Sequence, residues 1–362
     1  MHMLGIETSC DETAAAVVTE TGDASRPWAL GSNVVASQTA IHREWGGVVP
    51  ELASRQHVRD ICGVVEAAVS HAGLSLADLG AVAVTHGPGL VGSLLVGVAF
   101  GKSLALGRGL PAIAVHHLAG HIESLTLAHG EMPLPAAVLV VSGGHTSLYL
   151  VAERGKYSLI GRTRDDAAGE AYDKVARILG LPYPGGPGVD RLARGGNDQA
   201  IAFPSTRLTH ADRHGPGDTG GAVLPPDVAR RIDFSFSGLK TAVMRYVRAA
   251  APGGGPLPDG QVADICASFQ RVAVAALLDR TFEAARCLNA RSVGIAGGVS
   301  ANSRLRADAE SRGRHHGIPV FVPPLSLSTD NAAMIAAAGL RRYRSVGASP
   351  LDFDAEPSLA LT

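Results

Sequence analysis

"GIETSCDETAAAVV", residues Gly5–Val18, combines the end of an apolar strand, a polar turn rich in Ser and Thr, and a second apolar strand. The stretch "VVSGGHTSLYLVAE", residues Val140–Glu153, repeats the same plan. Elsewhere short apolar strands alternate with longer helical patterns, which is typical of α/β proteins. We therefore expect an α/β fold in which a strand–turn–strand unit opens each of two duplicated lobes.

The length of the chain also favours two lobes, because 362 residues exceed the usual size of one domain. Nucleotide-binding folds of the actin, hexokinase and Hsp70 type are built from duplicated lobes with a nucleotide cleft between them, and we expect such a fold here. The segment "HGEMPLP", residues 129–135, marks a boundary. We predict an N-terminal lobe of residues 1–125 plus about 331–362, and a C-terminal lobe of residues 126–330.

Composition and charge limit the classes of function. The chain is 46% hydrophobic and 18% charged, so it can form a sizeable core. Its formal net charge of −1 provides no global basic field that would attract nucleic acid. A local cluster of Arg341, Arg342 and Arg344 is either an RNA-binding face or an ordinary solvated surface.

Cysteine usage and the N-terminus favour a cytoplasmic protein. The four cysteines form no CxxC motif, which fits reduced thiols better than a disulfide framework. The first residues lack the pattern of a signal peptide. The longest apolar stretch, Val91–Leu106, is interrupted by Lys102, and we expect it to fall short of a membrane span.

The motif "AVHHLAGHIE", residues Ala114–Glu123, places His117 and His121 on one face of a helix. This spacing suits two ligands of one metal ion, although it can also arise by coincidence in a chain with 14 histidines. A zinc protease of the HExxH type needs a Glu where this chain has Leu118, so the motif supports a metal without a peptidase base. Asp330 is a candidate third ligand or, alternatively, the N-cap of the Ala-rich helix that follows it. Two histidines and one aspartate with open positions suit iron, zinc or manganese.

Gly-rich turns indicate where an anion could bind. "VVSGGHTS", residues Val140–Ser147, lets backbone N–H groups approach an anion, although a tight hairpin turn is the alternative. "VGIAGGVSANSRLR", residues Val293–Arg306, is a strand, a Gly-Gly turn and a helix start with Asn302 in its first turn, which favours a phosphate or nucleotide. Between them, Asp173 lies on a predicted helix and Asp190 at the start of another, where capping is its alternative role.

Two further motifs are weaker than they first look. "GPGLVG", residues Gly87–Gly92, matches GxGxxG, but the next strand ends in "VHH" and lacks the acid that would hold a ribose. We expect close packing of helix on strand instead. "GVAFGKS" is one residue too short for a P-loop, and its Lys102 falls inside a predicted helix.

Eight motifs, taken in order, closely resemble the TsaD family, the tRNA N6-adenosine threonylcarbamoyltransferases. They span Gly5 to Ala336: "GIETSCDET", "THGPGLVGSLLVG", "HHLAGH", "VSGGHT", "DDAAGEAYDKVARILGLPYPGGP", "FSFSGLKTAV", "GGVSANSRLR" and "TDNAAMIA". The resemblance implies an actin-like (ASKHA) two-lobed fold. It also implies transfer of a threonylcarbamoyl group from threonylcarbamoyl-AMP to N6 of adenosine 37, in tRNAs that read codons beginning with A, which forms t6A.

The resemblance assigns roles to individual residues. One divalent metal ion, commonly iron with zinc or manganese as alternatives, would be held by His117, His121 and Asp330. The donor would contact Val140, Val141, Ser142, Gly143, Gly144, Asp173, Gly186, Asp190 and Asn302. Because the donor is already an activated mixed anhydride, no water needs activation, and the metal can act as a Lewis acid. Asp11 or Glu12, in the first polar turn, could supply a catalytic base.

The resemblance also implies partners and leaves alternatives. The expected partners are tRNA, a shorter actin-like paralogue, a small P-loop ATPase and an upstream threonylcarbamoyl-AMP synthase. One departure is an additional Gly/Pro-rich loop at residues 207–231, which leaves the motifs intact. The alternative functions are a metallopeptidase, a label once attached to this family as a glycoprotease, an actin-like ATPase or sugar kinase, and a non-catalytic scaffold.

Overall fold

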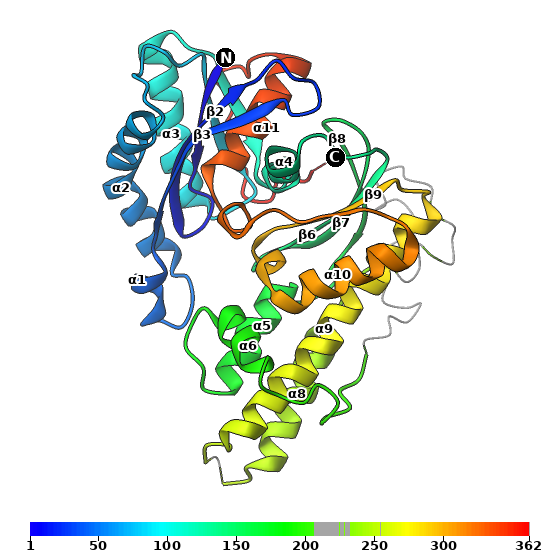
Figure 1. Cartoon of the computed structure of the whole chain (residues 1–362). Helices are drawn as coiled ribbons and strands as arrows, with labels where there is room; N and C mark the ends of the chain where they lie inside the picture. Colours follow the sequence, from blue (N-terminus) through cyan, green and yellow to red (C-terminus); the bar gives the residue numbers. More distant parts are fainter. Residues whose placement is uncertain (206–223, 225–227, 229–231, 254, 362) are drawn as a thin grey trace. The chain divides into compact units, whose positions relative to one another are not determined.

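The computed structural model describes residues 1–205, 224, 228, 232–253 and 255–361. The loop expected at residues 207–231 therefore lies almost wholly outside the described residues. The chain divides into two compact units, which are considered one at a time (Figure 1). Unit 1 consists of Met1–Met132 and Pro323–Leu361, and unit 2 of Pro133–Val322. The lobe limits given from the sequence stay a prediction.

Unit 1 contains a five-stranded sheet with the order β3-β2-β1-β4-β5. Its strands are β1 (His2–Glu7), β2 (Glu12–Glu20), β3 (Trp28–Ser37), β4 (Ala81–Gly87) and β5 (Ala112–His116). The first three strands pair antiparallel, whereas β1 with β4 and β4 with β5 pair parallel. The central strands are apolar almost throughout, because helices cover both faces of this sheet.

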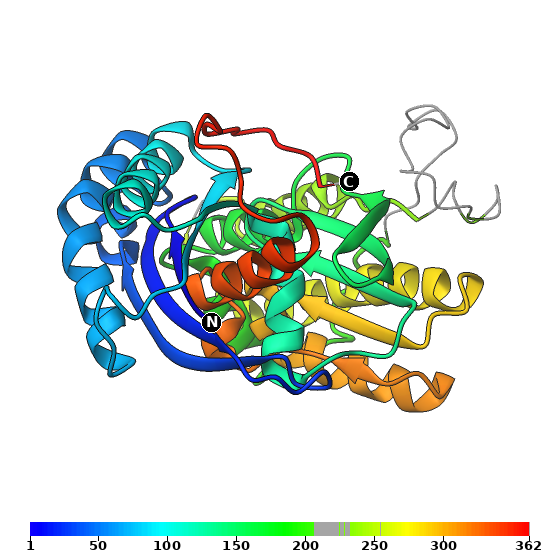
Figure 2. The same ribbon diagram turned by 90° about the horizontal axis from the view of Figure 1, so that it is seen from above.

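Two groups of helices bury the faces of this sheet. Alternate residues of β1 point to opposite faces, so Met3 joins one core cluster and Leu4 the other. Helices α2 (Pro50–His71) and α3 (Val91–Arg108) cover the Leu4 face, and α11 (Ala332–Val346) covers the Met3 face (Figures 1 and 2). The unit is completed by α1 (Thr39–Arg43), α4 (His117–His129) and the short helix η4 (Leu325–Leu327).

Helix α11 lies unusually close to the sheet because glycine and alanine meet there. A Cβ atom on Gly5 would lie 2.3 Å from the carbonyl oxygen of Ala332 and 2.7 Å from the amide nitrogen of Ala336. The Ala-rich sequence of α11 and the glycine in β1 are therefore matched. This contact fixes the start of α11, and with it the residue Asp330 just before it.

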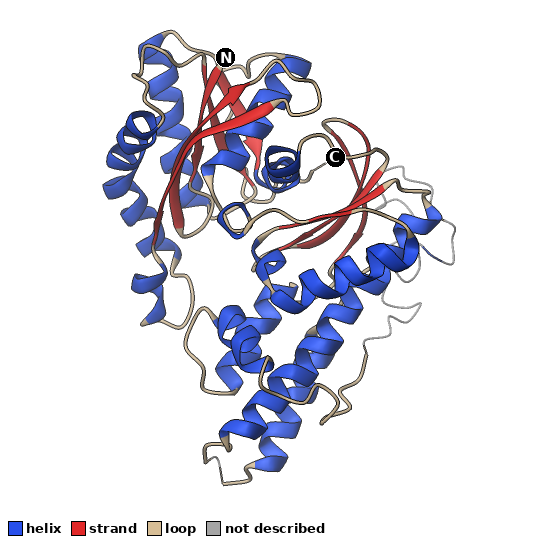
Figure 3. Ribbon diagram, viewed as in Figure 1, coloured by secondary structure: helices blue, strands red, loops and turns tan. Residues whose placement is uncertain are grey.

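Unit 2 repeats the sheet of unit 1 (Figure 3). Its strands are β6 (Ala136–Val141), β7 (Thr146–Glu153), β8 (Lys156–Arg162), β9 (Ser292–Ala296) and β10 (Val320–Phe321), in the order β10-β9-β6-β7-β8. In both units the first strand in the chain is central, pairs antiparallel with the second and parallel with the fourth. The α/β class and the duplicated plan predicted from the sequence are thus confirmed.

The helices of unit 2 pack around α9 (Asp259–Cys287), whose Phe269 and Leu277 are fully buried. The others are α5 (Ala168–Ile178), α6 (Gly185–Ala193), α8 (Ser237–Ala250), α10 (Ser303–His316) and the 3-10 turn η3 (Gly298–Ala301).

The first two glycines of "GPGLVG" serve close packing, although against a turn and the C-terminal segment and not of a helix on a strand as expected. A Cβ atom on Gly87 would lie 2.1 Å from the carbonyl oxygen of Glu356, and one on Gly89 would lie 2.6 Å from that of Ser9. Lys102 lies inside α3, where its Nζ donates to the carbonyl of Phe353 at 2.8 Å. In the first motif the amides of Gly89 and Leu90 donate to the carbonyls of Pro357 and Ser9, and the second motif lies within the helix α3.

The expectation about membrane spans needs a correction. Among the described residues, α3 and α9 are both long and apolar enough, by length and composition alone, to cross a membrane. Each nevertheless has a packing role within its unit. A Cβ atom on Gly101 of α3 would lie 3.2 Å from Val84 of the sheet, and α9 is a largely buried core helix.

Candidate functional site

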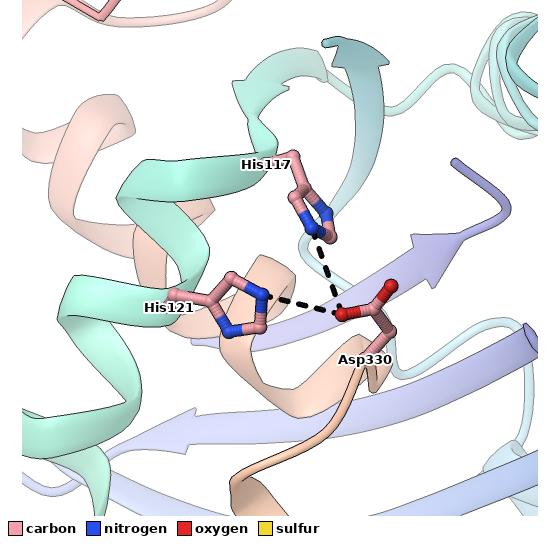
Figure 4. Close-up of side chains that lie close together, drawn as sticks. All are labelled: His117, His121 and Asp330. Atoms are coloured by element: carbon pink, nitrogen blue, oxygen red, sulfur yellow. Dashed lines mark ion pairs between the residues drawn. The ribbon is translucent and has the colours of Figure 1, made fainter. Parts of the chain in front are cut away.

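The three predicted metal ligands converge within unit 1 (Figure 4). His117 opens α4 and His121 lies one turn later, so both imidazoles point from the same face of the helix. The Nε2 atoms of His117 and His121 lie 3.6 and 3.2 Å from the same oxygen, Oδ1 of Asp330. The structure therefore brings together residues that are more than 200 positions apart in the sequence.

Asp330 is not the N-cap of the helix that follows it. That cap is Asn331, whose side-chain oxygen accepts a hydrogen bond from the amide of Met334 at 3.1 Å. The capping role considered as an alternative for Asp330 therefore belongs to Asn331. Its carboxylate lies beside the two histidines instead.

The donor set fits a metal ion. Two ligand atoms that are each about 2.1 Å from one ion at a tetrahedral angle lie about 3.4 Å apart, close to the observed distances of 3.2 and 3.6 Å. Among the residues that the structure describes, Nδ1 of His121 is buried without a hydrogen-bond partner, and the buried Nε2 has the ion pair with Asp330 at 3.2 Å. A buried imidazole nitrogen costs free energy unless a partner satisfies it, and a metal ion at Nε2 would do so. The assignment of these residues as ligands stays a prediction.

Neighbouring carboxylates change the protonation of His117. Burial lowers the pKa of His117, but the negative charges of Asp330 and Glu7 raise it by more, to about 9. Burial is also the largest influence on His121, and its pKa is lowered. In the metal-free protein one positive charge on His117 therefore balances the surrounding carboxylates. A metal cation would replace that proton.

Glu7, at the end of β1, is a residue of this site that sequence reasoning missed. Its side chain is fully buried, and its Oε2 atom lies 2.9 Å from Nδ1 of His117. The only signal available in the sequence was the position of Glu7 just before the first polar turn. Nothing in that position indicates a contact with a helix 110 residues later.

Of the candidate bases, Asp11 lies in the turn between β1 and β2, and Glu12 is the first residue of β2. The backbone carbonyl of Asp11 accepts a hydrogen bond from the amide of Gln38, which fixes the turn against α1. Burial, followed by the charges of Asp330 and Asp11, raises the pKa of Glu12 well above its usual value. The turn therefore carries an acidic group near the metal ligands, and a catalytic role for either residue stays a prediction.

The predicted donor turn opens unit 2. Strand β6 ends at Val141, and the amide of Ser142 donates to the carbonyl of His145 at 2.8 Å. A Cβ atom placed on Gly143 or Gly144 meets no described atom within 4 Å, and neither residue has a positive φ. By contrast, a Cβ atom on Gly169 would lie 2.6 Å from the carbonyl oxygen of Ser142. Packing thus requires glycine at 169 but not at 143 and 144, where an approaching ligand would provide the reason.

The glycine and aspartate of the α5–α6 connection lie close together. Oδ1 of Asp173 accepts a hydrogen bond from the amide of Gly185 at 2.7 Å, which ties α5 to the start of α6. A Cβ atom on Gly185 would lie 2.4 Å from that of Ala176, whereas one on Gly186 meets nothing within 4 Å. Gly186 therefore resembles the glycines of the donor turn.

The side chains of Asp190 and Asn302 are linked by hydrogen bonds to Gln270, a residue that belongs to none of the sequence motifs. Asp190 lies inside α6 and not at its start, so the alternative role of capping that helix is wrong. Its Oδ1 accepts hydrogen bonds from Oγ of Ser303 at 2.8 Å and from Nε2 of Gln270 at 3.2 Å. Oε1 of Gln270 in turn accepts from Nδ2 of Asn302 at 2.8 Å. Asn302 is itself the N-cap of α10, where it accepts from the amide of Leu305.

The arginine cluster near the C-terminus is not a free basic face. Arg341 forms salt bridges with Glu123 at 3.1 Å and Glu131 at 2.8 Å and lies over the ring of Trp28. Arg344 forms a two-point salt bridge with Glu20. Both side chains are therefore held in ion pairs within unit 1, and the reading of this cluster as a set of phosphate contacts stays a prediction.

Comparisons with known proteins agree with these motifs. The family model described as "TsaD: tRNA N6-adenosine threonylcarbamoyltransferase" matches residues 29–337. Two similar relatives carry the name tRNA N6-adenosine threonylcarbamoyltransferase. The one from Moorella thermoacetica is 49% identical, over 99% of this chain and 97% of its own. The one from Anaeromyxobacter dehalogenans (strain 2CP-C) is 50% identical, over 99% of both. Among solved structures, component A of the (R)-2-hydroxyglutaryl-CoA dehydratase of Acidaminococcus fermentans is 14% identical with a TM-score of 0.48, over 95% of this chain and 98% of that chain.

Proposed function

The chain belongs to the TsaD family of tRNA N6-adenosine threonylcarbamoyltransferases, which form t6A in tRNA, and we propose that it performs this transfer with a metal ion held by His117, His121 and Asp330. The observation that carries the proposal is the convergence of two imidazole Nε2 atoms on one carboxylate oxygen. Family membership also sets aside the peptidase, ATPase, sugar kinase and scaffold alternatives.

The proposed ion is iron(II), with zinc or manganese as the alternatives. Two imidazoles and one carboxylate form the donor set that is associated with non-haem iron when other positions stay open. All three ligands come from unit 1. When bound, the ion supplies a Lewis acid that polarises the carbonyl oxygen of the group being transferred.

The proposed donor is threonylcarbamoyl-AMP, recognised by residues of unit 2. The backbone amides of Gly143 and Gly144 suit the phosphate, because these glycines leave space for an anion to approach. The network of Asp190, Gln270 and Asn302 offers buried polar groups for the rest of the nucleotide. We include Val140, Val141, Asp173 and Gly186 among the donor contacts because they match the family motif.

The transfer forms one bond and breaks another. The N6 nitrogen of adenosine 37 attacks the carbamoyl carbon, and the bond from this carbon to the phosphate oxygen breaks and releases AMP. The proton lost from N6 goes to a carboxylate, for which Asp11 and Glu12 are the candidates in this chain. Because an exocyclic amine of adenine is a poor nucleophile, positioning of the two substrates should provide much of the rate.

The proposed setting is the cytoplasm, with the partners that the family implies. These are a shorter actin-like paralogue, a small P-loop ATPase and an upstream synthase that makes the adenylate. The formal net charge of −1 gives the chain little attraction for a polyanion, so we expect tRNA to bind weakly to it alone and more tightly with the paralogue present.

The test combines the reaction with the metal. Purified protein is incubated with threonylcarbamoyl-AMP, tRNA and the partner proteins, and tRNA nucleosides are then analysed by mass spectrometry. We expect t6A with the wild-type protein and none with His121→Ala, together with loss of bound metal from that variant. Full activity of a protein from which all metal has been removed would contradict the proposed role of the ion.

A further inference from the structure

Glu7 is a carboxylate that the fold buries completely, which is costly unless its oxygens are satisfied. Its Oε1 accepts a hydrogen bond from the amide of Ser9. Its Oε2 accepts from Oγ1 of Thr85 at 2.8 Å and lies 2.9 Å from Nδ1 of His117. The contact with His117 therefore belongs to a set of hydrogen bonds that hold the carboxylate in one place.

The sheet makes this position rigid. Glu7 is the last residue of β1, and the preceding Ile6 pairs with Val84 of the neighbouring strand β4, which also supplies Thr85. Glu7 is thus fixed by β1 and β4, whereas His117 is supplied by α4. A residue held by regular secondary structure can orient a partner more accurately than one on a loop.

The two nitrogens of the His117 ring face two different carboxylates. Nδ1 lies 2.9 Å from Glu7 and 3.2 Å from the hydroxyl oxygen of Ser9, and Nε2 lies 3.6 Å from Asp330. A neutral imidazole carries only one hydrogen, and the nitrogen without it has the lone pair that binds a metal. If Nδ1 carries the hydrogen and donates it to Glu7, Nε2 is left with its lone pair directed towards Asp330.

We propose that Glu7 is the positioning residue of the metal centre, which keeps a hydrogen on Nδ1 of His117 while the ion replaces the proton on Nε2. The proposal rests on the metal role assigned to His117 above. The two histidines then differ in orientation, because a carboxylate holds Nδ1 of His117, whereas Nδ1 of His121 has no hydrogen-bond partner among the described residues. A carboxylate behind a metal-bound imidazole also makes that imidazole a stronger base and a stronger ligand.

The chain contains a matched control. Glu123 is a second buried glutamate, on α4 itself, and it pairs with Arg341 at 3.1 Å. Its substitution by Gln removes a buried charge from the helix that carries both histidines. A loss of general stability in α4 would therefore affect Glu123→Gln and Glu7→Gln alike, whereas a loss of orientation at His117 would affect only the latter.

The experiment measures binding of Co²⁺ to metal-free protein by its visible absorption and by calorimetry, so no catalytic readout is needed. We expect Glu7→Ala to bind Co²⁺ about 10- to 100-fold more weakly than the wild type. Glu7→Gln should lie between them, because an amide oxygen can still accept from Nδ1 but carries no charge. Glu123→Gln should bind Co²⁺ as the wild type does.

Nuclear magnetic resonance of the imidazole nitrogens provides a spectroscopic signature. With Zn²⁺ bound, His117 of the wild type should show hydrogen on Nδ1 and metal on Nε2. Glu7→Gln is close in shape to the wild type, so it keeps the test decisive if Glu7→Ala does not fold. Wild-type Co²⁺ affinity in Glu7→Gln and Glu7→Ala, or equal losses in Glu7→Gln and Glu123→Gln, would overturn the inference. Failure of the wild type to bind any metal would instead refute the proposed function.

Discussion

Gly5→Ala is expected to damage the metal centre without changing any residue that touches the ion. The added methyl group would lie 2.3 Å from the carbonyl oxygen of Ala332 and 2.7 Å from the amide nitrogen of Ala336. Both are backbone atoms of α11, so no side-chain rotation can relieve the overlap. The helix itself has to move.

The required movement is large compared with the geometry of the site. Non-bonded contacts of carbon settle near 3.5 Å, so the start of α11 has to retreat by about 1 Å. Overpacking of this kind costs about 1–3 kcal/mol, and contact with backbone puts Gly5→Ala at the upper end, which corresponds to a fall of about 5–10 °C in Tm. Asp330 precedes α11 by two residues and would move with it, so we expect metal affinity to fall by at least about tenfold.

Thermal unfolding and Co²⁺ titration measure the two effects separately. The control is Gly63→Ala in α2, where a Cβ atom meets nothing within 4 Å. There the substitution should raise stability by about 0.5–1 kcal/mol and leave metal affinity unchanged, since alanine favours a helix more than glycine does. The reasoning is refuted if Gly5→Ala binds Co²⁺ as tightly as the wild type.

Four other predictions follow from the site and its surroundings. Asp330→Ala should lose bound metal and transfer activity while its circular dichroism stays that of the wild type, and retention of full metal content would exclude it as a ligand. Gly143→Val should lose affinity for a non-hydrolysable adenylate analogue at unchanged Tm, because a Cβ atom at this position meets no described atom within 4 Å; unchanged affinity would mean that the turn is only structural. In the metal-free protein the pKa of His117 is raised from 6.5 to about 9. Its contribution to the free energy of unfolding is therefore fully present below about pH 6.5 and is lost as the pH rises through 9. Urea unfolding should show this loss of stability, and a saturating metal should abolish it. Arg341→Ala should destabilise the protein by about 3–5 kcal/mol, because it removes one half of a buried ion pair with Glu123, and an unchanged Tm with weaker tRNA binding would support the RNA-contact reading instead.

Local spacing predicted the parts of the site that lie within one element. The i, i+4 relation of His117 and His121 is a property of any helix, so the sequence was sufficient to place both on one face. The repeated strand–turn–strand plan likewise predicted the duplicated sheets, because each unit occupies a short stretch of chain. Asp330 was a candidate as an oxygen donor just before a helix, but only the resemblance to a family favoured it over the capping role, since nothing local relates it to residues more than 200 positions earlier.

Contacts over long separations explain what sequence reasoning missed or misread. Glu7 lies 110 residues from His117, and Gln270 lies inside a long helix with no motif around it. Arg341 was read as a candidate surface charge because its partner Glu123 is 218 residues away. In each case the sequence did not show which distant side chain contacts the residue. Contacts between residues far apart in the chain produce no periodic pattern in the sequence.

The discontinuous course of unit 1 sets the order in which its parts leave the ribosome. Residues 133–322, the whole of unit 2, are synthesised between the helix with the two histidines and the segment with Asp330. At about 5–20 residues per second, the third ligand follows His121 by about 10–40 s. During that interval the sheet of unit 1 lacks the helix that covers its Met3 face, while unit 2 is already complete. The nascent chain therefore carries an uncovered apolar surface and an incomplete ligand set together, and the arrival of a single helix near the C-terminus ends both conditions.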